Sequence, residues 1–172
     1  MKAIGLVCGG LLLTISLASQ PASAQTASAE LRNSQGDKVG SATLVEGPQG
    51  VKITLEASNV PQGRHAFHIH TVGQCEPPAF TPAGGHFTPH GKKHGLMSPE
   101  GPHAGDLPNL VVGPDGAARV EVYAAHVTLG SGTHSLFHPG GTAVIVHADP
   151  DDEKSDPTGN AGGRIACGIV TR

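Results

Sequence analysis

The sequence predicts an all-β domain, an antiparallel sandwich or barrel of about eight short strands with two long functional loops. Three observations support this prediction. Short apolar segments, several of which alternate apolar and polar residues, recur along residues 25–172. Glycine and proline are abundant, at 25 and 14 residues, and they collect between those segments. That part of the chain shows no convincing helical period.

The strands of the first half are separated by turn sequences. Residues 27–32 are a first short strand, and residues 38–46 resume as a strand of small residues after the turn at 33–37. Residues 51–57 (VKITLEA) follow a Gly-Pro-Gln-Gly turn and alternate apolar and polar side chains, which is typical of a half-buried strand. Residues 64–71 are the next expected strand.

The second half contains the two long loops. Residues 72–110 keep no regular period, which counts against a compact domain unless a metal and a disulfide clamp the loop. Strands are expected at 117–123 and at the β-branched segment 142–147, with a shorter apolar piece near 127–129. A second long loop covers 148–163, and residues 165–171 are the last strand.

The first 24 residues have the layout of a secretory signal peptide, so that residues 25–172 form the single domain. A positive start precedes an apolar run over residues 3–18, and residues 21–24 (PASA) offer an Ala-x-Ala cleavage site. A retained membrane helix is the alternative, but the run is short and wrongly flanked for one, and no later segment could span a bilayer. We expect a periplasmic or extracellular protein without a stable membrane anchor.

Charge and cysteine content restrict the classes of partner and the cellular compartment that we expect for this protein. The formal net charge is −3, and −4 once the signal peptide and its single lysine are removed, which argues against nucleic acid as a partner. Cys75 and Cys167 remain after cleavage, and in an oxidising compartment such a pair predicts a disulfide. Monomer and homodimer both remain open.

Histidines are concentrated in one stretch, which indicates a bound transition metal. Residues 63–106 contain seven of the eleven histidines. His68 and His70 alternate on an expected strand, so their rings project from the same face. His65 has the opposite parity and is better interpreted as a packed histidine that holds the backbone by hydrogen bonds. Two imidazoles side by side on a strand predict a pair of metal ligands.

The following loop predicts a second metal site. His86, His94, His103 and Asp106 provide three nitrogens and one carboxylate, a complete tetrahedral set for structural zinc. The pair on the strand is incomplete alone, and His147 at the end of a β-branched strand is the best candidate to extend it. Nitrogen-only coordination favours copper over zinc.

Several motifs then occur in order across nearly all of residues 25–172. They are Gly63-x-His65-x-Phe67-His68-x-His70, Gly85-His86-Phe87-x-Pro89, Lys93-His94-Gly95, His103-x-Gly105-Asp106-Leu107, Val146-His147 and Gly159-Asn160-Ala161-Gly162-x-Arg164-x-Ala166-Cys167-Gly168. This series resembles the copper/zinc superoxide dismutases, and the export signal and loop lengths resemble exported bacterial members. The resemblance implies a Greek-key fold and dismutation of superoxide, a small anion, to oxygen and hydrogen peroxide by alternate reduction and oxidation of copper.

The resemblance also implies a role for each site residue. Copper would be bound by His68, His70, His86 and His147, and zinc by His86, His94, His103 and Asp106. His86 would bridge the two ions as an imidazolate, and its copper side would be released and protonated when copper is reduced. Arg164 would guide the anion, with Thr158 flanking the opposite side of the channel. Asp151 would link a copper histidine, His70 or His68, to the zinc ligand His94, and His65 would support the site from outside the ligand set.

Two further interpretations complete the expectations. A non-catalytic exported copper carrier on the same scaffold is the alternative function, but a carrier needs neither a bridging His86, nor a closed zinc set, nor Arg164. Four histidines match no ligand position and are interpreted as surface residues, with weak adventitious metal binding as the alternative: His90, His126, His134 and His138.

Overall fold

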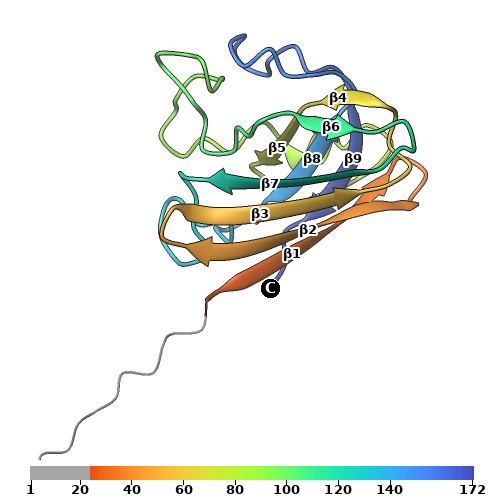
Figure 1. Cartoon of the computed structure of the whole chain (residues 1–172). Coiled ribbons are helices and arrows are strands. Elements are labelled where there is room, and N and C mark those ends of the chain that lie inside the picture. The colour runs from red at the N-terminus through yellow and green to blue at the C-terminus, as the bar shows by residue number, and fades with distance from the viewer. Residues whose placement is uncertain (1–23) are drawn as a thin grey trace, which may run out of the picture.

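The structure, a computed structural model, describes residues 24–172 and consists almost entirely of β-strands and loops (Figure 1). No helix within those residues is long and apolar enough to cross a membrane. The described elements are β1 (Thr26–Asn33), β2 (Lys38–Gly47), β3 (Gly50–Ala57), β4 (Gly63–His65), β5 (Phe67–His70), the 3₁₀ turn η1 (Thr81–Ala83), β6 (Leu110–Val112), β7 (Ala118–Ala124), β8 (Ala143–His147) and β9 (Arg164–Ile169).

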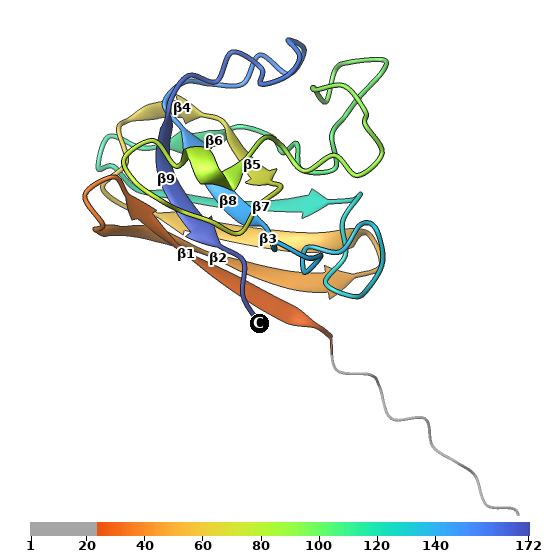
Figure 2. The ribbon, with the colours of Figure 1, turned by 180° about the vertical axis from the view of Figure 1, so that it is seen from behind.

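Seven of the strands form one antiparallel sheet that folds over itself. Their order is β5-β8-β9-β1-β2-β3-β7, and β4 pairs separately with β6. Strands β1, β2, β3 and β7 form one layer, and β5, β8 and β9 cross behind it (Figures 1 and 2). After β3 the chain crosses to the opposite edge at β5 and then returns to β7 beside β3. The all-β antiparallel fold predicted from the sequence is confirmed.

The core lies between the two layers and is built from aliphatic residues. On β3 the side chains of Val51, Ile53 and Leu55 are fully buried, while the residues between them are partly exposed. Phe67 and Phe80 are the largest fully buried side chains, and the other large ones are all leucine or isoleucine, as the scarcity of aromatics requires. Burying each such side chain contributes about 1.5 to 3 kcal/mol, which makes this alternation the main determinant of strand register.

Strands β5 and β8 differ from the others because both of their faces are buried. Phe67 and Ile69 of β5 face the main core. On the opposite face, Ala143 and Ile145 of β8 pack in a second, smaller cluster with Phe80, Ala83 and Cys167. Loops therefore cover the outer face of this half of the sheet. His68 and His70 of β5 point to the same covered face and are themselves buried.

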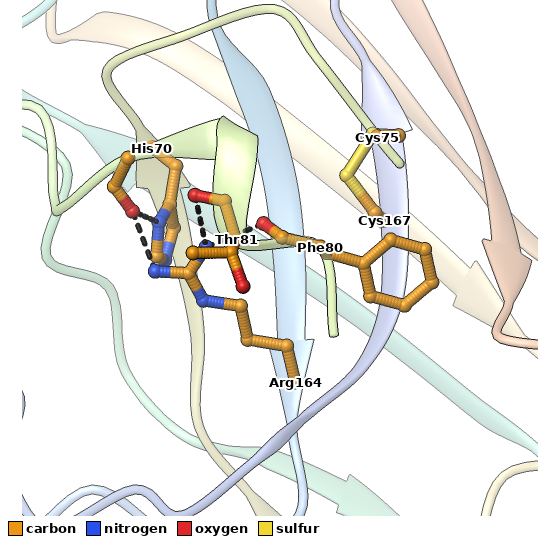
Figure 3. Close-up of a disulfide and its surroundings, with 7 residues drawn as sticks. His70, Cys75, Phe80, Thr81, Arg164 and Cys167 are labelled. Carbon is orange, nitrogen blue, oxygen red and sulfur yellow. Dashed lines mark hydrogen bonds between the residues drawn. A yellow bond between two sulfur atoms is a disulfide. The ribbon is translucent and has the colours of Figure 1, made fainter. Parts of the chain in front are cut away.

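A disulfide fastens one of these loops to the sheet. Cys75, five residues after β5, is bonded to Cys167 in β9, with the two Cα atoms 5.6 Å apart (Figure 3). The bridge spans 92 residues of sequence. The disulfide predicted from the cysteine count is present, and it holds the loop that contains η1 against β8 and β9.

Three details differ from the predicted elements. The single strand expected over residues 64–71 is divided at Ala66 into β4 and β5. Strand β4 pairs with β6 and β5 pairs with β8, and the backbone of Ala66 between them bonds to Asp149 and His147. Strand β6 was not predicted. Residues 127–129 form no strand, only an isolated bridge from Thr128 to Ser135. The predicted signal peptide lies almost wholly in residues 1–23, outside the described residues.

Candidate metal centre

The site is assembled along the free edge of β5. One edge of this strand pairs with β8, and loop residues bond to the other. The backbone N–H of Phe87 donates to the carbonyl oxygen of Ile69 at 2.8 Å, and the N–H of Ile69 donates to the carbonyl oxygen of Gly105 at 2.9 Å. These bonds place His86, which precedes Phe87, opposite His70 of β5. They place Asp106, which follows Gly105, opposite His68. A Cβ at position 105 would lie 2.2 Å from the carbonyl oxygen of Ile69, so only glycine fits there.

A first group of buried histidines combines two neighbouring strands with the loop. Its members are His68 and His70 of β5, His86 of the loop and His147 at the end of β8, and one ring nitrogen of each lies within 4.8 Å of the others. The Nε2 atoms of His70 and His147 are 3.4 Å apart. Nδ1 of His68 and Nε2 of His86 are buried and have no hydrogen-bond partner. Unpartnered buried nitrogens are rare, and here they indicate a site for a cation.

A second buried group surrounds one carboxylate oxygen. Oδ1 of Asp106 lies 2.9 Å from Nδ1 of His86, 3.0 Å from Nδ1 of His94 and 3.3 Å from Nδ1 of His103. The other oxygen of Asp106 accepts hydrogen bonds from the backbone N–H groups of Gly95 and His103 at 2.8 and 2.9 Å. The carboxylate is therefore oriented by the backbone, with one oxygen left to face the three imidazoles.

His86 belongs to both groups. Its Nδ1 faces Asp106, and its Nε2 faces the first group. A second link joins the groups through Asp151, whose carboxylate lies 2.7 Å from Nε2 of His68 and 3.0 Å from Nε2 of His94. Of the two partners left open by the sequence, His68 and not His70 contacts Asp151. This contact fixes the tautomer of His68 so that Nδ1 carries the lone pair that faces the first group.

Two residues that support Asp151 were not predicted from the sequence. The side chain of Asn109 accepts a hydrogen bond from the N–H of Asp151 at 2.7 Å and donates to its carbonyl oxygen at 2.9 Å. Gly159 has a φ of +63°, and a Cβ there would lie 1.9 Å from the Asp151 carboxylate and 2.6 Å from Nε2 of His94. Asn109 carries no sequence signal, and Gly159 begins the motif that contains Arg164 but nothing in that motif relates it to Asp151.

Three histidines of the first group, His70, His86 and His147, are neutral at physiological pH. Burial, reinforced by the neighbouring imidazoles, lowers the pKa of His70 to about 2, and burial together with nearby His68 lowers the pKa of His147 to about 3. Burial lowers the pKa of His86 to about 4 despite its contact with Asp106. A neutral imidazole offers a lone pair to a metal without first losing a proton. The first group is thus ready to coordinate a cation.

The second group combines an ionised carboxylate with a protonated imidazole. Burial opposes ionisation of Asp106, but hydrogen bonds from His103, His86 and His94 outweigh it and hold the pKa of this carboxyl far below its usual range. For His94, burial disfavours the charged form, yet hydrogen bonds to Asp106 and Asp151 raise the pKa to about 9. In the absence of metal a proton on His94 balances the charge of Asp106, and a bound cation would displace this proton.

Arg164 lies at the edge of the first group, at the start of β9. Figure 3 shows its guanidinium beside His70 and directed at the backbone of Phe80 and Thr81. One terminal nitrogen donates to the carbonyl oxygen of Phe80 and the other to that of Gly84, both at 2.5 Å. Its positive charge contributes to lowering the pKa of His70 and of His147. The arginine is therefore close to the first group and is held by the disulfide-closed loop.

The remaining predicted site residues have simpler surroundings. The ring of His65 contacts the carbonyl oxygen of His147 at 2.9 Å and that of Pro61 at 2.8 Å, so it ties β4 to the backbone of a residue of the first group. Thr158 is exposed in the loop after β8. Its backbone bonds to Ser155 and Ala161, and no hydrogen bond among the described residues joins it to Arg164.

Comparison with known proteins agrees with this geometry. A family model described as copper/zinc superoxide dismutase (SODC) matches residues 38–170. The chain belongs to the copper/zinc superoxide dismutase family. It is 51% identical to superoxide dismutase (Cu-Zn) 2 of Aquifex aeolicus, over 98% of both chains. It is 41% identical to superoxide dismutase (Cu-Zn) of Caulobacter vibrioides, over 84% of this chain and 85% of that one.

Solved structures give the same fold. A crystal structure of a superoxide dismutase-like protein from Bacillus subtilis superimposes with a TM-score of 0.80 at 38% identity, covering 83% of this chain and 96% of that chain. Membership of the family makes the chain an oxidoreductase that dismutates superoxide, with copper and zinc as its cofactors. The two buried groups fit these ions, because one offers four nitrogens and the other three nitrogens and a carboxylate.

Proposed function

We propose that the first group binds the copper ion and the second group binds the zinc ion of a superoxide dismutase, with His86 shared between them. Copper is assigned to His68, His70, His86 and His147, and zinc to His86, His94, His103 and Asp106. The observation that carries the assignment is the pair of buried, unpartnered nitrogens on His68 and His86, both on the side of the first group. When bound, copper supplies the one-electron redox chemistry of dismutation and zinc supplies a redox-inert charge.

The shared imidazole has a defined part in this proposal. Nδ1 of His86 is directed at the zinc group by Asp106, and Nε2 is directed at the copper group. Both nitrogens are proton-free only when two cations replace both protons. Nε2 is the atom of this ring that would hold a proton when it is free of copper, and that would donate this proton to the reduced anion. Asp106, 2.9 Å from Nδ1, keeps the ring oriented while this proton is exchanged.

Arg164 is proposed to attract and orient superoxide beside the copper group. Its guanidinium stays charged at any physiological pH, and its planar fork is suited to a small anion. Two carbonyl oxygens of the disulfide-closed loop hold it in place. We place Thr158 only at the rim of the approach, since its side chain is exposed.

The experiment that tests the proposal measures metal content and activity together. The mature protein is purified, its copper and zinc per chain are determined, and superoxide removal is followed with and without copper. One copper and one zinc per chain with copper-dependent activity is the expected result. His86→Ala is expected to weaken the binding of both ions. Retention of both ions at normal affinity would contradict the bridging role of His86. Stoichiometric metal without activity would favour the alternative, an exported copper carrier.

We also propose that the protein is exported to the periplasm or beyond. Support comes from the signal-peptide pattern of residues 1–24 and from the disulfide, because structural disulfides persist in oxidising compartments. Amino-terminal sequencing of protein from the native host tests it, with a mature chain starting at Gln25 as the expected result. Monomer and homodimer are distinguished by sedimentation of the same material.

A further inference from the structure

A pocket outside the metal centre is lined by three of the histidines that match no ligand position. It has a volume of about 210 Å³ and lies between the segment that follows His86, residues 88–102, and the loop between β7 and β8. His90 comes from the first segment, and His126 and His134 come from the second. None of the three belongs to either buried group. His90 and His126 are exposed, and His134 is half-buried.

Two of these histidines face one another. Nε2 of His90 lies 2.7 Å from Nε2 of His134, and the ring centroids are 4.5 Å apart with the planes tilted by 58°. The two residues are 44 positions apart in sequence, so the fold and not local chain geometry brings them together. In the buried zinc group, for comparison, Nδ1 of His86 and Nδ1 of His103 are 3.4 Å apart.

The tautomer of His134 is set by its other nitrogen. Nδ1 of His134 lies 2.7 Å from the carbonyl oxygen of His126, which can only accept, so Nδ1 carries the proton. In the neutral ring Nε2 therefore carries a lone pair that points at Nε2 of His90, which donates its N–H to it when no metal is bound. Metal-binding histidines generally donate their second N–H to a carbonyl or carboxylate in this manner. His134 has the arrangement of a metal ligand although no buried site uses it.

We propose that His90 and His134 form a surface site for a divalent transition-metal ion, separate from the catalytic copper and the structural zinc. An ion bound at about 2.0 to 2.1 Å by two nitrogens at adjacent positions of a square-planar site, the geometry of copper(II), separates them by about 2.9 Å. The two nitrogens are 2.7 Å apart, so the pair must open by about 0.2 Å to reach that separation. Side chains on two surface loops can do this by small rotations.

Copper(II) is the ion that such a site favours. Among divalent first-row ions it binds nitrogen ligands most strongly, ahead of nickel and zinc. Water completes the coordination, because the ring nitrogens of His126 do not join the pair in a group of three. Lys92 also lines the pocket, and its positive charge makes this site weaker than the buried ones. Bound copper would cross-link the segment after His86 to the loop between β7 and β8.

Copper titration of the fully loaded protein tests the proposal. Protein with both buried sites filled is washed with a mild chelator and titrated with Cu²⁺, and binding is followed by calorimetry and electron paramagnetic resonance. The expected result is one further equivalent of Cu²⁺ per chain with a nitrogen-ligand spectrum. His90→Gln and His134→Gln are each expected to weaken this equivalent at least about tenfold, with unchanged dismutase activity and thermal unfolding.

His126→Gln is the matched control, because it removes a histidine of the same pocket that is outside the pair. It is expected to change the affinity for the extra Cu²⁺ less than about threefold. Copper bound by the amino terminus would be retained by all three variants. The proposal is overturned if the wild-type protein takes up no further equivalent, if His90→Gln and His134→Gln retain it, or if His126→Gln removes it equally.

Discussion

Arg164 and His70 share one acceptor, the carbonyl oxygen of Gly84. The guanidinium donates to it at 2.5 Å, and Nδ1 of His70 lies 2.8 Å from it. Gly84 follows η1 in the loop that Cys75 fastens to β9. The same carbonyl therefore orients a proposed copper ligand, so that its Nε2 faces the site, and positions the positive charge beside that ligand. Three features predicted separately from the sequence depend on one short loop.

Replacing the arginine should slow the reaction without removing the metals. Arg164→Ala is expected to lower kcat/KM about tenfold or more, because attraction of an anion by a charge beside its target raises the rate of association. Arg164→Lys keeps the charge but cannot donate to Phe80 and Gly84 with the same planar fork, so an intermediate value is expected. Steady-state superoxide removal at several salt concentrations measures the effect, with copper and zinc per chain as the control. Full activity in Arg164→Ala would contradict the role.

Removing the disulfide should affect both stability and activity. The double variant with Cys75→Ser and Cys167→Ser leaves no free thiol in the mature chain and is expected to lose about 4 to 5 kcal/mol of unfolding free energy in the chain-entropy model. Because Arg164 and His70 rely on the closed loop, kcat/KM should also fall at temperatures where the variant remains folded. Urea unfolding and activity on the same samples measure the two effects. Unchanged kcat/KM in the folded variant would show that the function of Arg164 does not depend on closure of the loop by the disulfide.

The carboxylate of Asp151 should govern zinc affinity from outside the ligand set. Asp151→Ala removes the contacts to Nε2 of His68 and of His94. Loss of such an orienting partner typically costs about 10- to 100-fold in metal affinity. Competition with a zinc chelator measures the change. Asp152→Ala is the control, since Asp152 is exposed and bonds only within its own loop, to Lys154, Ser155 and Asn160. Equal zinc affinity in Asp151→Ala and the native protein would contradict this role.

The extent to which the sequence revealed the site depends on what each residue contributes. His68 and His70 are recognisable because strand alternation places them on one face, and His147 because it ends a β-branched strand. The roles of Asn109 and Gly159 were not predicted, although Gly159 begins a quoted motif, because holding Asp151 and leaving room for it produce neither periodicity nor ligand spacing. The sequence does not show that His68 and not His70 contacts Asp151. The partner is decided by where each ring nitrogen lies in the fold, with Nε2 of His68 at Asp151 and Nδ1 of His70 at Gly84.

The fold was predictable where burial alternates and less so where strands change partners. Residues 51–57 alternate because one face of β3 meets the core, and their strand was found with nearly correct bounds. Residues 64–71 have the composition of one strand, but Ala66 is where pairing changes from β6 to β8. That change is set by strands more than 40 residues away in sequence. The backbone bonds between the free edge of β5 and residues 85–87 and 105 could not be predicted either, because those residues show no strand periodicity.

Removing both metals should give a protein whose stability is greatest near pH 6.5. In that form the pKa values of His70, His86 and His147 are lowered from 6.5 to about 2, 4 and 3. Below pH 6.5 the unfolded chain therefore binds protons that the folded chain does not. The unfolding free energy falls as the pH is lowered toward those values, by up to about 1.4 kcal/mol per pH unit for each group.

His94 produces the opposite limb of the same curve. Its pKa in the folded, metal-free protein is raised to about 9 by Asp106 and Asp151, against the effect of burial. Its contribution is fully present below pH 6.5 and is lost as the pH rises through about 9. Urea unfolding of the chelator-treated protein from pH 4 to pH 10 measures both limbs. His94→Gln should flatten the alkaline limb and leave the acid limb in place, because the three histidines of the copper group are unchanged. A steady rise in stability from pH 4 to pH 10 would show that the buried carboxylates do not hold a proton on His94 when zinc is absent.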